Sequence, residues 1–166
     1  IKKYNSLGLQ IHLTKGYGEH LGINDKNYVS EGATILNTNE EVLKNSDAII
    51  QMNLPRDENL NNLKNDQILI GVLNPYDNEK KLEEIKSKNV KCFSLELLPR
   101  ITRAQSMDIL SSQANLAGYK AVIDSFAYFQ KAVPMMMTAA GTISAAKVLV
   151  VGAGVAGLQA IATAKR

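Results

Sequence analysis

The chain has 166 residues, of which 45% are hydrophobic and 21% are charged, a composition typical of a globular protein. Its net charge of +3 comes from 19 basic and 16 acidic residues scattered along the chain, and the absence of a basic block argues against a nucleic-acid-binding surface. No apolar stretch reaches the roughly 20 residues that a membrane-spanning helix needs. A single cysteine, Cys92, excludes an internal disulfide and any multi-cysteine metal site, so no metal is expected.

The N-terminal half of the chain alternates short apolar runs with short helical patterns. We expect strands at residues 10–13, 34–36, 47–52, 67–73 and 90–95, and helices at 25–33, 39–44, 57–63 and 78–88. Asp25 is predicted to cap the first of these helices, Leu82 and Ile85 to form the inward face of the last, and Cys92 to be a buried small hydrophobe. Alternating strands and helices predict βαβ units and a mostly parallel sheet.

The pattern changes at Pro99. The polar segment Arg100–Asp108 precedes a predicted long helix at residues 111–131, which would run about 30 Å and connect two domains. Its inward stripe is predicted to consist of Leu116, Tyr119, Ile123 and Phe126. Pro134 and Gly141 then bracket a predicted loop, whose three consecutive methionines suit gap-filling at a domain boundary better than an adaptable binding surface.

A glycine cluster near the end of the chain carries the first functional signal. Val148–Val151 is predicted to be a strand buried on both faces, and an alanine-rich helix should follow the cluster. Between them, Gly152, Gly154 and Gly157 form the pattern G-x-G-x-x-G, with Ala153 and Val155 in the turn. This order of strand, glycine turn and helix N-terminus predicts a pyrophosphate site for a dinucleotide. The alternative is a glycine-rich turn in an α/β protein that binds no nucleotide.

The glycine pattern does not separate NAD from NADP. The acidic residue that would bind the ribose hydroxyls is expected about 20 residues beyond the turn, and the sequence stops at Arg166. We therefore predict two Rossmann-like α/β domains with parallel sheets, joined by a long helix, in a fragment that starts within a helix and stops inside the second domain. The predicted boundaries are 1–110 for the first domain, 111–134 for the connecting helix and 135–166 for the start of the dinucleotide-binding domain.

Three stretches carry a resemblance to a known family. They are GYGEHLGINDKNYVSEGATI at residues 16–35, PRITRAQSMDILSSQANLAGYKAV at 99–122, and the sequence from Phe129 to Arg166. Together they resemble the NAD(H)-binding component, the alpha subunit, of proton-translocating NAD(P) transhydrogenase. Alanine dehydrogenase is a relative with the same architecture.

The resemblance implies a second set of site residues. In the transhydrogenase, a loop with an arginine, a glutamine and an aspartate reaches toward the nicotinamide end of NAD(H), and Arg100, Gln105 and Asp108 match it as catalytic residues. Their chemistry suits the task, because an arginine binds phosphate or amide oxygen, a glutamine pairs with a carboxamide, and an aspartate can anchor the arginine. Four further residues are candidate cofactor contacts, namely Ile101, Thr102, Arg103 and Ser111. The alternative is a helix N-cap cluster, since Thr102, Ser106, Asp108 and Ser111 all favour helix starts.

The choice between transhydrogenase and alanine dehydrogenase depends on the first domain. Alanine dehydrogenases carry a lysine and a histidine for the substrate there, and the matching stretches, QMNLP and IGVLNPYDN, contain neither. The two histidines, His12 and His20, fall elsewhere and are interpreted as structural or surface residues. Hydride transfer between two nicotinamides moves no proton at the reacting carbons, so the lack of an acid–base pair fits that reaction.

The resemblance further implies an activity and partners. NADH bound to this chain would pass hydride to NADP⁺ held on a separate NADP(H)-binding component, and a membrane-embedded component would couple the transfer to proton translocation. The family forms a homodimer of this subunit that docks on the cytoplasmic face of the inner membrane, or on the matrix face. Alanine dehydrogenase activity and a non-catalytic nucleotide sensor are the competing hypotheses.

Overall fold

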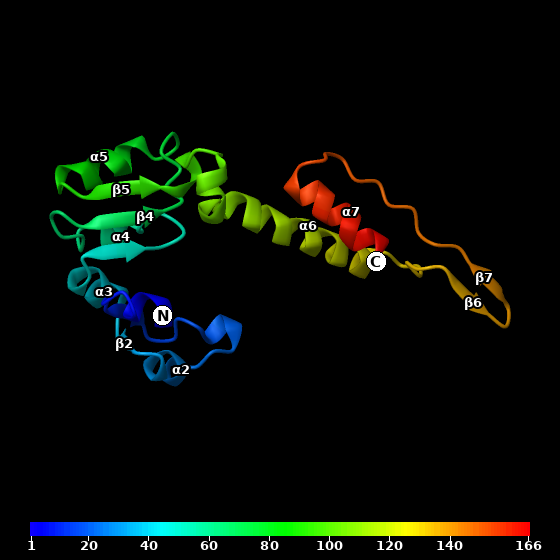
Figure 1. Ribbon diagram of the computed structural model, residues 1–166, viewed down its shortest axis with the longest axis horizontal. Coiled ribbons are helices and arrows are strands. Elements are labelled where there is room, and N and C mark those ends of the chain that lie inside the picture. The colour runs from blue at the N-terminus through cyan, green and yellow to red at the C-terminus, as the bar shows by residue number, and fades with distance from the viewer. The chain divides into compact units, whose positions relative to one another are not determined.

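The computed structural model describes all residues from Ile1 to Arg166, which form two compact units (Figure 1). Ile1–Leu97 make up the first unit and Leu98–Arg166 the second. The long helix belongs entirely to the second unit, and the domain boundaries at 110 and 134 stay predictions. No helix combines the length and hydropathy that crossing a bilayer requires.

The first unit is an α/β structure in which every strand pair is parallel. β1 (Ile11–Thr14) pairs with β2 (Ala33–Leu36), and β4 (Ile68–Gly71) lies between β3 (Ala48–Ile50) and β5 (Lys91–Ser94) in a second, three-stranded sheet. The connecting elements are α1 (Lys2–Asn5), η1 (Glu19–Leu21), α2 (Asp25–Ser30), α3 (Asn39–Asn45), α4 (Asp57–Leu60), α5 (Glu79–Ser87) and η2 (Leu95–Leu97). The predicted strand and helix order and the parallel pairing are confirmed.

One apolar core holds β3, β4 and their helices together. Ile85 of α5 is 1% exposed and Leu82 packs against the same cluster, which confirms the predicted inward face of this helix. Leu69 at the centre of β4 is fully buried. The remaining members are Leu43, Ile49, Leu60, Leu63, Leu73 and Val90.

Two local predictions in the first unit are wrong. The cap of α2 is Asn24, whose side chain accepts a hydrogen bond from the Lys26 N–H, while Asp25 accepts from the Gly16 N–H in the preceding loop. The helix also stops at Ser30 instead of reaching residue 33, because Gly32 takes a positive φ of 88° that ends a helix.

Cys92 is exposed, so the prediction of a buried hydrophobe is also wrong. It lies in register with Leu69 of β4, but β5 is an edge strand with a single neighbour, which leaves the thiol partly uncovered. Desolvation by the surrounding atoms nevertheless raises the pKa of the thiol. A raised pKa disfavours the nucleophilic thiolate.

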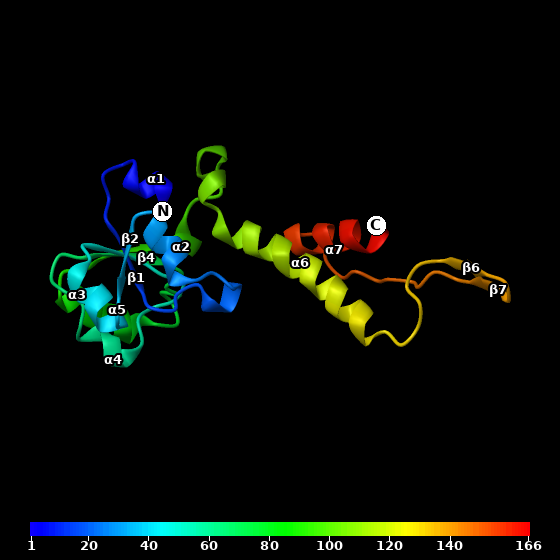
Figure 2. The same cartoon turned by 90° about the horizontal axis from the view of Figure 1, so that it is seen from below.

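The second unit consists of two helices, a 3₁₀ segment and a hairpin. η3 (Thr102–Met107) leads into α6 (Ile109–Tyr128), whose 20 residues span about 30 Å as predicted. The predicted loop after Pro134 instead contains β6 (Met136–Thr138) and β7 (Gly141–Ile143), which pair antiparallel. The Thr138 hydroxyl closes that turn by accepting from the Ala140 N–H. An extended segment then returns to α7 (Val155–Lys165), which lies beside α6 in both views (Figures 1 and 2).

The buried face of α6 differs from the predicted stripe. Gly118 and Val122 are buried, whereas Leu116, Tyr119 and Ile123 are 58%, 50% and 40% exposed. The reason lies in α7, which contains five alanines and glycines in its first ten residues and packs closely against the smallest residue of α6. Helical periodicity identifies large apolar residues but does not reveal which face a partner helix occupies.

Candidate dinucleotide-binding site

The glycine turn, formed by residues 152–157, leads into α7, and its three glycines differ in backbone conformation and packing. Gly152 has a φ of +97°, which side-chain-bearing residues rarely adopt, and Gly154 is the N-cap of α7. A Cβ added to either residue would have no neighbour within 4 Å, so the main chain of the turn faces open space. A Cβ on Gly157 would lie 2.0 Å from the Gly152 carbonyl oxygen. The turn is therefore open on one side and tightly packed on the other.

The start of α7 is suited to bind an anion. Gly154 has no side chain with which to cap the helix, and the Leu158 N–H is the first to donate to a helix carbonyl, that of Gly154, at 2.9 Å. The N–H groups before it have no intrahelical partner and carry the positive end of the helix dipole. A diphosphate at the open side of the turn would satisfy them, so this part of the structure fits a dinucleotide.

The strand predicted before the turn is not formed. Residues 147–152 pair with no other strand, and Leu149 and Val151 are 87% and 91% exposed. A β-strand needs a neighbour to satisfy its N–H and C=O groups, and none of the seven strands of this structure lies beside the segment. The prediction of a strand buried on both faces is therefore wrong for these 166 residues.

The Arg100 loop, residues 100–108, is a polar, exposed segment with one buried apolar residue. Ala104 in the middle of η3 is buried, and its N–H donates to the Ile101 carbonyl at 2.9 Å. The candidate contacts around it are exposed, namely Arg100, Ile101, Thr102, Arg103 and Gln105. Sequence reasoning missed Ala104, for which the only signal is one small apolar residue inside a polar run.

Asp108 and Ser111 form the N-cap of α6. One Asp108 carboxylate oxygen accepts from the Ser111 N–H at 3.0 Å, and the other accepts from the Ser111 hydroxyl at 2.7 Å. These hydrogen bonds from Ser111, with a smaller contribution from the charge of Arg100, lower the pKa of Asp108. Arg100 forms no ion pair with Asp108, so the expected anchoring of the arginine by the aspartate is not formed in this structure. The N-cap alternative thus describes the contacts of Asp108 and Ser111, whereas Arg100 and Gln105 take no part in the cap.

Helix α6 links the loop and the turn. Asp108 caps its start, and Gly118, ten residues later, contacts the first turn of α7. Ten helical residues correspond to about 15 Å along the axis. Sequence reasoning also missed Gly118, although a glycine inside a helical pattern is a known signal of close packing.

The stretches and histidines that bear on alanine dehydrogenase activity all belong to the first unit. QMNLP follows β3 in the first unit, and IGVLNPYDN begins with the last two residues of β4. In the second stretch, Asn74 has a φ of +45° and donates its N–H to the Glu96 carboxylate. His12 lies in β1 and His20 in η1. No three histidine, cysteine, aspartate or glutamate side chains converge as metal ligands would.

Comparison with known families accounts for nearly the whole chain. Residues 1–117 match the family "Alanine dehydrogenase/PNT, N-terminal domain", and residues 121–166 match "Alanine dehydrogenase/PNT, C-terminal domain".

Several relatives carry the name of a transhydrogenase. The chain is 45% identical over 163 residues to a subunit alpha polypeptide of the NAD(P) transhydrogenase of Rickettsia prowazekii, and the match covers 96% of this chain and 43% of that protein. It is 44% identical to the corresponding polypeptide from Rhodospirillum rubrum, over 100% of this chain and 44% of that protein. The crystal structure of a transhydrogenase from Sinorhizobium meliloti superposes with a TM-score of 0.94 at 46% identity, over 99% of this chain and 49% of that one.

Alanine dehydrogenases are more distant. That of Methanococcus maripaludis is 25% identical over 92% of this chain and 41% of that protein. An L-alanine dehydrogenase structure has a TM-score of 0.81 at 17% identity, which shows a shared fold. The chain spans less than half the length of each of these relatives.

Proposed function

Because the chain belongs to the alanine dehydrogenase/PNT family, we propose that it is the NAD(H)-binding part of a proton-translocating transhydrogenase. In this function, hydride passes directly from bound NADH to NADP⁺ held on a separate component. The observation that carries the proposal is the contrast in identity, which is 35–46% to transhydrogenases and 17–25% to alanine dehydrogenases over nearly the same residues.

The diphosphate of NAD(H) binds at the start of α7. Its contacts are main-chain groups of the turn, formed by Gly152, Ala153, Gly154, Val155 and Gly157. The open space beside Gly152 and Gly154 supports this assignment, because any side chain there would occupy the path of the ligand. The helix N-terminus adds partial positive charge opposite the two phosphates.

The Arg100 loop binds the nicotinamide end. Arg100 and Gln105 contact the carboxamide, and Asp108, held by Ser111, fixes the end of the loop on α6. Ile101, Thr102 and Arg103 complete the lining of the site. Arg100 forms no ion pair with any carboxylate of the structure, which leaves its guanidinium available to a ligand and supports this assignment.

The reaction needs positioning more than acid–base chemistry. Nicotinamide supplies the hydride chemistry, and transfer from one ring to another moves no proton at the reacting carbons. The protein therefore has to hold one ring within reach of the other and keep water away. A loop of exposed arginine and amide side chains meets the first requirement without a general base.

The intact protein acts within a larger complex. We propose a homodimer of this subunit, a partner component that binds NADP(H), and a membrane-embedded component that moves protons. The subunit is peripheral and is attached at the cytoplasmic face of the inner membrane through that complex. The net reaction converts NADH and NADP⁺ into NAD⁺ and NADPH.

A reconstitution experiment tests the proposal. Full-length protein is mixed with the NADP(H)-binding component of a bacterial transhydrogenase, and hydride transfer from NADH to thio-NADP⁺ is followed by absorbance. We expect transfer that requires both proteins. NADH binding without transfer would instead favour a nucleotide sensor, and alanine-dependent reduction of NAD⁺ by the full-length protein alone would favour an alanine dehydrogenase.

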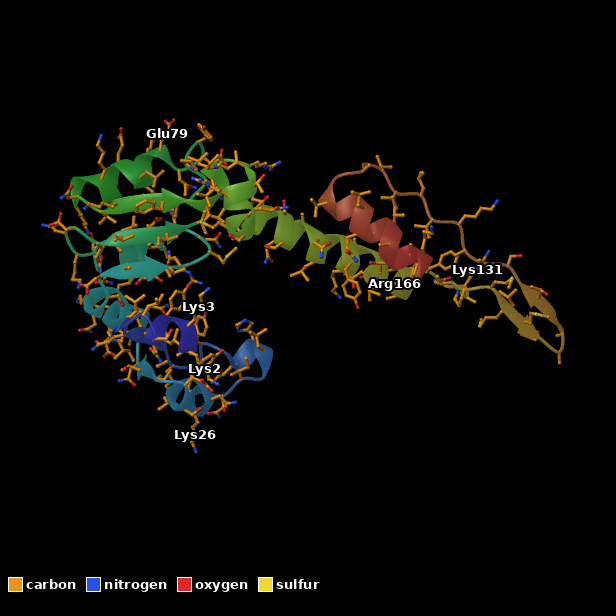
Figure 3. The ribbon with its side chains drawn as sticks, viewed as in Figure 1. Lys2, Lys3, Lys26, Glu79, Lys131 and Arg166 are labelled. Atoms are coloured by element: carbon orange, nitrogen blue, oxygen red, sulfur yellow. The ribbon has the colours of Figure 1, made fainter.

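A pair of variants links the activity to the loop. Arg100→Gln removes one of the two cationic side chains of the loop, Arg100 and Arg103, and we expect transfer to fall by about tenfold to a hundredfold, the range typical of a misplaced reactant. Lys131→Gln is the matched control, because Lys131, labelled in Figure 3, follows the other end of α6 and is exposed. Equal activity of the two variants would refute the role of Arg100.

A further inference from the structure

Gly118 of α6 lies at a point where the main chains of α6 and α7 are very close together. It is buried, and a Cβ built on it would lie 2.1 Å from the carbonyl oxygen of Ala156, 2.9 Å from its carbonyl carbon and 3.0 Å from its Cα. All three atoms belong to the main chain of α7, so no side-chain rotation can relieve the clash. Any side chain at position 118 would have to push α7 away from α6.

The main-chain group that Gly118 touches belongs to the first turn of α7. The carbonyl of Ala156 and the N–H of Gly157 are parts of one planar peptide unit, which moves as a rigid body. In a helix the carbonyl points toward the C-terminus and the N–H toward the N-terminus. The N–H of the peptide that Gly118 contacts therefore points toward the N-terminal end of α7, where the glycine turn lies.

A second close contact of a glycine involves the same turn. A Cβ on Gly157 would lie 2.0 Å from the Gly152 carbonyl oxygen. The first turn of α7 is thus in close contact with both Gly118 of α6 and the carbonyl of Gly152. The G-x-G-x-x-G pattern accounts for the second contact but does not include Gly118.

We propose that Gly118 is a positioning residue for the diphosphate site, because its lack of a side chain sets the place of the Ala156–Gly157 peptide. This inference rests on the proposed function, since it assigns a purpose to a residue outside the glycine pattern. Gly118 touches no ligand itself. It acts through the Gly157 N–H, whose direction depends on how closely α7 approaches α6.

The geometry indicates the size of the effect. Ordinary contact begins near 3.4 Å, so an added Cβ requires α7 to move by about 1 Å. A displacement of that size at a binding group can reduce activity by about a hundredfold. We therefore expect Gly118→Ala to weaken diphosphate binding by at least about tenfold. Helix propensity acts in the opposite direction, because alanine favours a helix more than glycine does.

The test compares ADP with adenosine in the full-length protein, using calorimetry to measure both dissociation constants. Wild-type protein is expected to bind ADP more tightly than adenosine, and Gly118→Ala to lose most of that difference while its affinity for adenosine changes little. Ala117→Ser is the matched control, because it adds one heavy atom to an exposed position of α6. The proposal would be overturned if Gly118→Ala reduced the affinities for ADP and adenosine equally, or reduced neither.

The outcomes separate this inference from the function on which it rests. Wild-type protein that binds ADP no better than adenosine would refute the diphosphate site and the inference together. Wild-type preference for ADP with an unchanged Gly118→Ala variant would refute only the inference.

If Gly118→Ala does not fold, hydrogen exchange of the wild-type protein decides the question. Saturating ADP is then expected to slow exchange both in the first turn of α7 and at residues 114–122 of α6, because it holds the two helices together. Slowed exchange in α7 alone would contradict the role of Gly118.

Discussion

The buried side chain of Gln67 offers a test of how the first unit is held together. Gln67 is 2% exposed and lies just before β4. Its amide nitrogen donates to the carbonyls of Leu43, at 2.7 Å, and Ser46, at 2.6 Å, and its amide oxygen accepts from the Lys64 N–H at 2.7 Å. One side chain thus provides hydrogen-bond donors for two carbonyls at the end of α3 and an acceptor for the turn before β4.

Replacing Gln67 with leucine leaves a side chain of similar size but removes all three hydrogen bonds. The Leu43 carbonyl then loses a buried partner, at a cost of about 2 kcal/mol, and the two partly buried groups lose about 0.5–1 kcal/mol each. The extra apolar burial of leucine offsets about 1 kcal/mol of this. We therefore expect Gln67→Leu to lower the free energy of unfolding by about 2–3 kcal/mol.

Urea denaturation of the full-length protein, followed by circular dichroism and by hydrogen exchange in β4, measures this change. Gln10→Leu is the control, because Gln10 is exposed in the same unit and the chemical change is identical. A difference between the two variants below about 0.5 kcal/mol, the usual effect of a surface substitution, would refute the reasoning.

Gln67→Glu adds a pH test. Its carboxylate would face the two carbonyls that the amide now satisfies, and burial raises the pKa of such a group. The variant should therefore gain stability relative to wild type as the pH falls through that raised pKa, because only the protonated acid can donate. A pH-independent difference between variant and wild type would contradict this role of the amide.

Three further predictions follow from the site. Asp108→Asn should preserve the cap of α6, since asparagine caps about as well as aspartate; unchanged hydrogen exchange at the start of α6 with weakened NADH binding would show a role beyond capping. Hydrogen bonds from Ser111 and the charge of Arg100 lower the pKa of Asp108. The cap should therefore be fully effective above the ordinary carboxyl pKa of about 3.9 and be lost as the pH falls through the lower folded pKa. A circular dichroism titration from pH 5 to 2 should be flatter in Asp108→Asn than in the wild-type protein. Gly157→Ala should cost about 1–3 kcal/mol of stability and reduce NADH affinity at least about tenfold, because its Cβ would meet a carbonyl at 2.0 Å; wild-type affinity measured by calorimetry would contradict this.

The local sequence pattern was sufficient to predict secondary structure wherever a segment's own residues determine its conformation. Alternating apolar runs and helical periods predicted the strands and helices of the first unit in order, and the pair Leu82 and Ile85 predicted the inward face of α5. Parallel pairing followed as well, because a helix between two strands brings them back in the same direction. The cap of α2 was missed by one residue, since Asn24 and Asp25 are both good caps and only the loop at Gly16 decides between them.

The amino-acid order by itself determined the α/β class, the glycine turn before α7 and the membership of the family, because each depends on residues close together in the chain. Only the tertiary structure decided which face of α6 is covered, that Cys92 lies on an edge, and that residues 147–152 have no partner strand. These outcomes depend on which segments meet. Burial and strand pairing are properties of two surfaces in contact, and a pattern within one segment describes only one of them.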